Sequence, residues 1–181
     1  LHVLCDLNVG GAERLVLDLC RLSPGVSAEV AVAPSPNNQL DPVVGGERTF
    51  ADDEGLVVWM EDGVGLQMRQ ITVPSSGAPS TQGPVVELQT DTPFYTYVVP
   101  AISSCAGDTG YFLVTWQRVD GADHFEIEAQ IVTRNAALVG SKVLVSTGDA
   151  ALQNYSHSVD GDGERWIVAW VVALMLVVCV S

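Results

Sequence analysis

An acidic turn near the C-terminus has the residue pattern best suited to binding a metal ion. Asp160, Asp162 and Glu164 alternate with two glycines. Carboxylates at alternate positions are similar to the first half of a calcium-binding loop, because Ca²⁺ prefers oxygen ligands. The turn lacks the distal glutamate that completes an EF-hand loop. The pattern therefore indicates either a calcium site at these three acids or a solvated hairpin turn.

Three of the four tryptophans recur at regular intervals along the chain: Trp59, Trp116 and Trp170. Exposed aromatic rings on strand faces can line a sugar site. Recurring aromatic side chains more commonly pack in a core, where each buries a large apolar area. We therefore expect these tryptophans to be core residues, with a sugar site as the alternative.

Patterns typical of catalysis are missing from the sequence. It contains neither a Gly-x-Ser-x-Gly elbow nor a Gly-rich phosphate loop ending in Gly-Lys. Neither the histidines nor the cysteines are spaced as metal ligands. The histidines are His2, His124 and His157, and the cysteines are Cys5, Cys20, Cys105 and Cys179. One disulfide bond between two of the cysteines is possible. We predict no catalytic residue.

Composition narrows the choice of partner. The chain has 181 residues, 48% of them hydrophobic and 17% charged, which favours a folded domain over disorder. The net charge is −14, and Lys142 is the sole lysine. A surface this acidic repels phosphate backbones and anionic membranes, so nucleic acid is excluded as a partner. Acid-rich, lysine-poor composition also fits an extracellular or cell-surface location.

An internal repeat is the main clue to the architecture. Three stretches end on tryptophan, at 55–59, 111–116 and 165–170, each with a valine two positions earlier and an acidic or glycine-rich turn before it. Alternating strands follow the first two, and Gln70-Ile71 aligns with Gln130-Ile131. This pattern predicts units of four antiparallel strands, the size of a propeller blade. A plain β-sandwich with three similar strands is the alternative.

The first 34 residues follow a different pattern. Leu1–Leu4 and Val30–Ala33 are short apolar runs that predict strands. Between them, Ala12–Leu22 carries apolar residues at helical spacing, and Pro24-Gly25 would end that helix. We therefore predict a small β-α-β segment over 1–34, a linker over 35–40, a β-repeat domain over 41–170 and an apolar tail over 171–181.

The C-terminal residues 166–180 form an uninterrupted apolar run. The run begins inside the third tryptophan stretch, so a buried strand that continues into a tail explains it. The alternative is that 166–181 begins a membrane anchor, although the run is shorter than a membrane-spanning helix requires.

The N-terminal segment resembles the start of family 4 glycosyltransferases. The resemblance rests on Leu1–Leu4, on Asn8-Val-Gly-Gly-Ala-Glu-Arg14 and on Leu15–Leu19. It implies that Gly10, Gly11 and Glu13 lie near a sugar-nucleotide cleft. Glycines allow close backbone approach, and amides at a helix start favour anions.

Residues 41–170 resemble the tryptophan-containing β-repeats of large secreted or surface bacterial proteins, through strands such as Leu113-Val-Thr-Trp116. This resemblance implies a binding or display module whose partner is a protein or glycan. Taken together, we predict a mainly all-β protein of antiparallel propeller-like repeats, about two units plus a partial one, preceded by the β-α-β segment. The predicted function is that of a non-enzymatic secreted or cell-surface module for binding or display. The alternative is a truncated or degenerate family 4-like glycosyltransferase that binds a sugar nucleotide at the Gly10-Gly11 turn.

Overall fold

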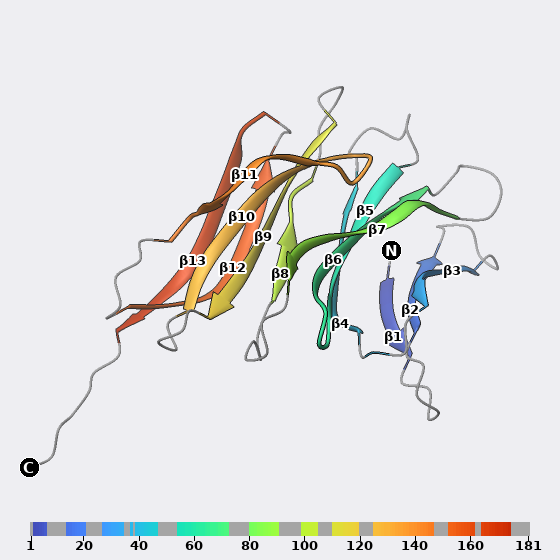
Figure 1. Cartoon of the computed structure of the whole chain (residues 1–181), viewed down its shortest axis with the longest axis horizontal. Helices are drawn as coiled ribbons and strands as arrows, with labels where there is room; N and C mark the ends of the chain where they lie inside the picture. The colour runs from blue at the N-terminus through green and yellow to red at the C-terminus, as the bar shows by residue number, and fades with distance from the viewer. Residues whose placement is uncertain are drawn as a thin grey trace, which may run out of the picture.

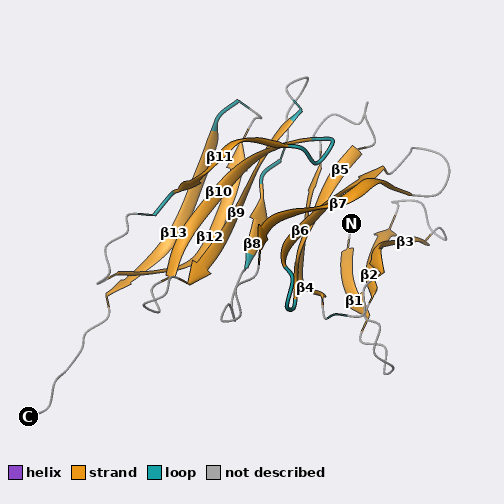
Figure 2. Cartoon of the chain, in the orientation of Figure 1, coloured by secondary structure: helices purple, strands orange, loops and turns teal. Residues whose placement is uncertain are grey.

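The computed structural model describes residues 2–6, 14–20, 27–34, 37, 39–46, 54–72, 80–90, 99–104, 110–119, 125–146, 152–161 and 164–174. Within these ranges the protein is built from antiparallel strands and contains no helix (Figure 2). This confirms the prediction of a mainly antiparallel β protein. The strands are β1 His2–Asp6, β2 Arg14–Cys20, β3 Ser27–Pro34, β4 Gln39–Gly46, β5 Glu54–Glu61, β6 Gly65–Thr72, β7 Ser80–Thr90, β8 Pro100–Ile102, β9 Tyr111–Val119, β10 Phe125–Thr133, β11 Leu138–Leu144, β12 Leu152–Gly161 and β13 Trp166–Leu174.

The strands form four sheets that follow one another in chain order. Their strand orders are β1-β2-β3, β4-β5-β6-β7, β8-β9-β10-β11 and β12-β13. Within each sheet, the strands that pair are consecutive in the sequence. Figure 1 shows the sheets arranged along the long axis, from the blue N-terminal sheet at the right to β13 at the left. Within the described residues these sheets do not close into a ring.

The helix predicted over Ala12–Leu22 is wrong where the structure describes it, because residues 14–20 form β2. This strand pairs antiparallel with both β1 and β3, so the segment is a three-stranded sheet and not a β-α-β unit. Leu15, Leu17 and Leu19 alternate along β2. This alternation in the sequence fits a strand, and the same stretch also satisfies helical spacing. Pairing with two neighbouring strands therefore overrides the local helical pattern.

The three tryptophan stretches occupy equivalent strands, namely β5, β9 and β13. The valine two positions before each tryptophan pairs with the first strand of its own sheet: Val57 with Val44, Val114 with Ile102 and Val168 with Val159. Each of the three strands is thus the second strand of its four-strand or two-strand sheet. The equivalence extends from sequence to backbone register.

A bulge recurs opposite the tryptophan in two of these sheets. The β4–β5 register shifts between Leu40 and Val43, and the β12–β13 register shifts between Tyr155 and Ser158. Inside these bulges Asp41 and Ser156 have φ values of 48° and 45°. Both residues adopt the left-handed conformation, which costs energy for any residue except glycine. A bulge at the same place is a second structural repeat.

The register corrects one detail of the sequence alignment. Gln130 pairs with Val114, whereas Gln70 pairs with Leu56 and Arg69 pairs with Val57. Because Val114 corresponds to Val57, the counterpart of Gln130 is Arg69. The connection after β5 is shorter than the connection after β9, so matching the two identical Gln-Ile pairs displaces the alignment by one residue.

The core lies between successive sheets. Leu56, Val58 and Met60 on β5 pack with residues of β9 on the next sheet, which are Phe112, Val114 and Trp116. Successive strand residues point to opposite faces, so the tryptophan-bearing face of one sheet covers the opposite face of the sheet before it. The next sheet continues this arrangement, because β12 packs against β9 and β10.

The C-terminal apolar run forms β13 as far as Leu174, and residues 175–181 lie outside the described part. No helix in the described ranges has the length and apolar character needed to cross a membrane.

Candidate functional site

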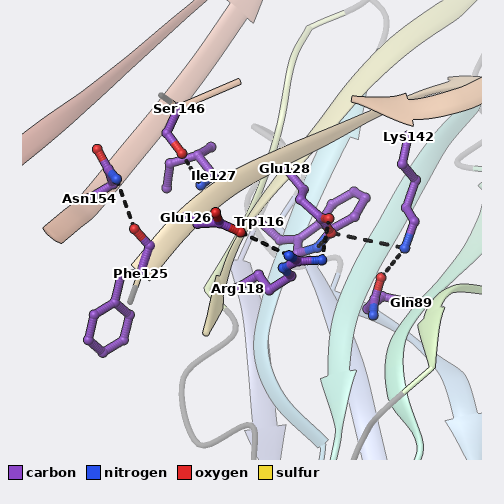
Figure 3. Close-up of polar contacts among 10 residues, drawn as sticks. All are labelled: Gln89, Trp116, Arg118, Phe125, Glu126, Ile127, Glu128, Lys142, Ser146 and Asn154. Atoms are coloured by element: carbon purple, nitrogen blue, oxygen red, sulfur yellow. Dashed lines mark hydrogen bonds and ion pairs between the residues drawn. The ribbon is translucent and has the colours of Figure 1, made fainter. Parts of the chain in front are cut away.

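A cluster of charged side chains lies at the junction between sheet β4–β7 and sheet β8–β11 (Figure 3). Its centre is Glu128 on β10, which sits directly opposite Trp116 on β9. One carboxylate oxygen accepts a hydrogen bond from Trp116 Nε1 at 3.1 Å, and the other accepts one from Arg118 at 2.9 Å. Glu128 is only 8% exposed. Because a buried carboxylate needs such donors, these bonds explain how the charge is accommodated.

Two cations surround this carboxylate. Arg118 also donates to Glu126 at 2.9 Å, so one guanidinium joins two neighbouring acids of β10. Lys142 on β11 places its ammonium 4.0 Å from Glu128 and 5.9 Å from the centre of the Trp116 ring. Lys142 also contacts Gln89 on β7 of the preceding sheet. The chain's sole lysine therefore joins the two sheets.

The chemistry of this cluster is that of a structural brace. Both carboxylates are engaged by cations, and Glu128 also holds an indole N–H, so neither is available as a general base without losing its partners. Charge-assisted hydrogen bonds of this kind fix side-chain positions. The sequence signal for the cluster is weak, because Glu126 and Glu128 resemble the solvent face of an alternating strand. The following and preceding sheets cover both faces of β10, and this burial cannot be predicted from the alternation alone.

A second polar junction attaches β12–β13 to the sheet before it. Trp170 Nε1 donates to Asn154 Oδ1 at 3.0 Å, and Asn154 Nδ2 donates to the carbonyl of Phe125 at 2.8 Å. The rings of Phe125 and Tyr155 pack with centroids 5.0 Å apart. The third tryptophan therefore contacts the preceding sheet through a bridging asparagine, where Trp116 uses a carboxylate of its own sheet.

His157 is the one histidine whose side chain the structure describes, and it is buried. Burial lowers the pKa of His157, because removal of the ring from water disfavours its charged form. The Thr115 backbone opposes part of this shift, but neither ring nitrogen makes a hydrogen bond of normal geometry. The Thr115 hydroxyl is also buried without a partner. His157 is therefore neutral in the folded protein near pH 7. His2 lies on β1, and His124 falls outside the described residues.

The residues predicted as binding sites fall largely outside the described ranges. Gly10, Gly11 and Glu13 are not among the described residues, and neither is Asp162. Asp160 and Glu164 are described and exposed, and Asp160 accepts a hydrogen bond from the Gly161 amide at 2.9 Å, as turn residues do. Within the described part, no group of three or more potential ligands is arranged to hold a metal ion.

The tryptophans lie where core residues lie. Trp59 and Trp116 are fully buried, and Trp170 is partly buried. Trp59 and Trp116 therefore present no surface on which a sugar could stack.

Comparison with known proteins gives no match, whether to family models, to curated proteins or to solved structures.

Proposed function

We propose that this chain is a non-enzymatic β-repeat module, secreted or held at the cell surface, which binds or displays a protein or glycan partner. In this proposal each four-stranded sheet is one propeller-like unit. The supporting observation is the shared register of β5, β9 and β13, where a valine and a tryptophan recur at the same places relative to the first strand.

The packing supports a modular role. Each sheet contacts mainly the sheets before and after it, and the polar groups at the junctions are engaged in holding sheets together. Proteins built this way gain stability from each unit and from each interface between neighbours. Their strand connections are free to vary, and connections of this kind carry binding function in many folds.

The experiment that tests the proposal compares nucleotide sugars with free glycans as ligands. A binding module gives strand-dominated circular dichroism and no rise in melting temperature with UDP- or GDP-sugars. Glycan or protein partners are sought by immobilising the chain and measuring retention. A melting-temperature rise with a nucleotide sugar, abolished by Gly11→Val, would contradict the proposal and support the glycosyltransferase alternative.

The same assay tests the calcium prediction at the 160–164 turn. A bound calcium ion raises the melting temperature by mass action, and Asp162→Asn should remove that rise. An unchanged melting temperature on adding calcium would show that the turn is an ordinary hairpin connection.

A further inference from the structure

One residue of β12 departs from a pattern that the first strands of the other two tryptophan sheets share. In each of the three sheets, one residue of the first strand pairs with the residue just before the tryptophan: Val43 with Val58, Ala101 with Thr115 and Ser158 with Ala169. The residues that precede these three are Pro42, Pro100 and His157. Sheet β12–β13 therefore carries an imidazole where the other two sheets carry an apolar proline ring.

His157 lies at the interface between β12 and the preceding sheet, where β12 packs against β9 and β10 (Figure 1). It sits in the bulge opposite Trp170, and its ring lies beside the Thr115 backbone. His157 is 9% exposed, and neither ring nitrogen makes a hydrogen bond of normal geometry. The Thr115 hydroxyl is also buried without a partner. A ring buried in this way is more stable in its docked position when it is neutral.

The sheet under the ring carries no described acid on the side that faces it. By strand alternation, β8, β9 and β10 present uncharged residues toward β12: Ala101, Leu113, Thr115, Gln117, Ile127, Ala129 and Ile131. Tyr111 shares this face at its far end and is 40% exposed. The charged residues of these strands lie on the opposite face with Trp116, and they are Arg118, Glu126 and Glu128.

Strands β12 and β13 add no described carboxylate beside the ring. Strand β13 contains no titratable residue. Strand β12 contributes Tyr155, whose ring packs on Phe125, and Asp160, which is exposed. Asp160 lies three positions after His157 and so points to the other strand face. Among the described residues, a protonated His157 would therefore be a buried charge without a carboxylate partner, and such a charge is costly.

We propose that protonation of His157 releases sheet β12–β13 from sheet β8–β11, while the sheets before them stay packed. The released ring regains contact with water, so protons favour release. The described residues at the junction of sheets β4–β7 and β8–β11 include no histidine, and the contacts of Glu128 hold that junction. Release would uncover Ile127 and Ala129, which are both 0% exposed. The inference goes beyond the proposed function, because it holds whichever partner the module binds.

Amide hydrogen exchange of the full chain at pH 7.5 and pH 5.5 tests the release, with rates corrected for the intrinsic effect of pH. The released ring has the ordinary pKa of about 6.5. Because the docked ring stays neutral, one linked proton raises the opening equilibrium about tenfold over this range. Amides of β12 and β13 should exchange faster than those of β5 and β6 at both pH values, and their rates should rise about tenfold at pH 5.5.

Two results of this measurement would overturn the proposal. The first is an unchanged rate in β12 and β13 at pH 5.5. The second is equal protection of β12, β13, β5 and β6 at both pH values, which would mean that the ring meets water only when the whole chain unfolds.

Variants assign the effect to the His157 ring. His157→Leu should remove the rise in the exchange of β12 and β13. Adding Ser158→His to that variant supplies an exposed histidine on the same strand, and it should not restore the rise. His157→Gln takes the place of His157→Leu if circular dichroism at pH 7.5 shows that the leucine variant is unfolded. A rise that persists without His157, or that returns with the histidine at position 158, would contradict the proposal.

Discussion

Three different groups converge on the buried carboxylate of Glu128. Trp116 and Arg118 donate hydrogen bonds, and Lys142 lies within ion-pair distance. A buried ion pair is not a strong source of stability by itself, since desolvation offsets the attraction. Removal of the Glu128 carboxylate is costly because its donors remain buried, and the indole N–H of Trp116 then lacks an acceptor.

Glu128→Ala should therefore lower the free energy of unfolding by about 2–4 kcal/mol. Glu126→Ala is the matched control on the same strand, because Glu126 accepts a hydrogen bond from the same guanidinium at 2.9 Å, whereas the indole N–H of Trp116 donates to Glu128. The cost of Glu126→Ala should stay below about 1 kcal/mol. Urea unfolding followed by tryptophan fluorescence measures both values. Equal losses for the two variants would mean that the Trp116 contact contributes nothing.

His157 gives the fold a predictable response to acid. Its pKa is lowered in the folded state by burial, so the unfolded chain binds a proton more readily than the folded chain. Stability from the neutral ring is fully present above the unfolded pKa of about 6.5 and is lost as the pH falls toward the folded pKa. The urea concentration at the midpoint of unfolding should decrease as the pH is lowered from 7 to 5. His157→Leu should make this dependence on pH less steep. A variant with an unchanged slope would place the acid sensitivity elsewhere.

At the scale of strands, the sequence is a good guide where two signals agree. Strands β5, β9 and β13 carry β-branched residues and also recur with the same valine and tryptophan, and all three are strands. For residues 14–20 the only indication is the spacing of the apolar residues, and that spacing fits both a helix and a strand. Leu15, Val16 and Leu19 match a helix, while Leu15, Leu17 and Leu19 match a strand. Pairing with β1 and β3 decides between them, and pairing partners are not visible in a local pattern.

The candidate site shows the same limit. That Trp116 is core follows from its type and its recurrence, but Glu128, Lys142 and Gln89 come from three strands of two sheets. Their meeting depends on how the sheets stack. A residue-by-residue alignment likewise does not predict the strand register. The bulges at Asp41 and Ser156 insert extra residues, and no pattern in the sequence indicates them.

The bulge in β12 supplies a prediction at this scale. Ser156 has a φ of 45° and sits in the register shift opposite Trp170. A β-branched side chain is poorly tolerated in the left-handed region, so Ser156→Val should destabilise the fold by about 1–2 kcal/mol. Ser158→Val is the control, because Ser158 is also exposed, lies on the same strand and pairs regularly with Ala169. Thermal unfolding compares the melting temperatures of the two variants. Equal decreases would show that the bulge does not depend on a left-handed conformation at residue 156.

At the scale of the molecule, the stack of sheets matters more than any one sheet. The core forms between neighbours, so a two-stranded sheet such as β12–β13 gains stability by docking on β9 and β10. The interface between β5 and β9 is also directional, because the face of β9 that bears Trp116 meets the face of β5 opposite to the one that bears Trp59. We therefore expect the units of this stack to be interchangeable. Removal of a whole unit should still leave matching faces on the two sheets that become neighbours.

Deletion of residues 99–155 tests that property. Ala101 and Ser158 occupy the same place relative to their tryptophans, so the deletion brings Ser156 to the position that Val99 held. The tryptophan-bearing face of β13 can then cover Leu56 and Val58 of β5. We expect the shortened chain to keep strand-dominated circular dichroism and cooperative unfolding, at a lower melting temperature because one interface is lost.

Deleting residues 70–126 removes the same length but joins β6 to β10 four residues out of register, because the counterpart of Arg69 is Gln130. It should leave an unfolded or aggregated product, whereas the deletion of 99–155 cuts β12 at a place where the register is kept. The comparison separates the effect of register from the effect of length, since both chains lose the same number of residues. If both deletions fold, the sheets do not depend on matched faces. If neither folds, the middle sheet is not an exchangeable unit, and equivalence of the tryptophan strands would be a likeness of sequence and register without independence in packing.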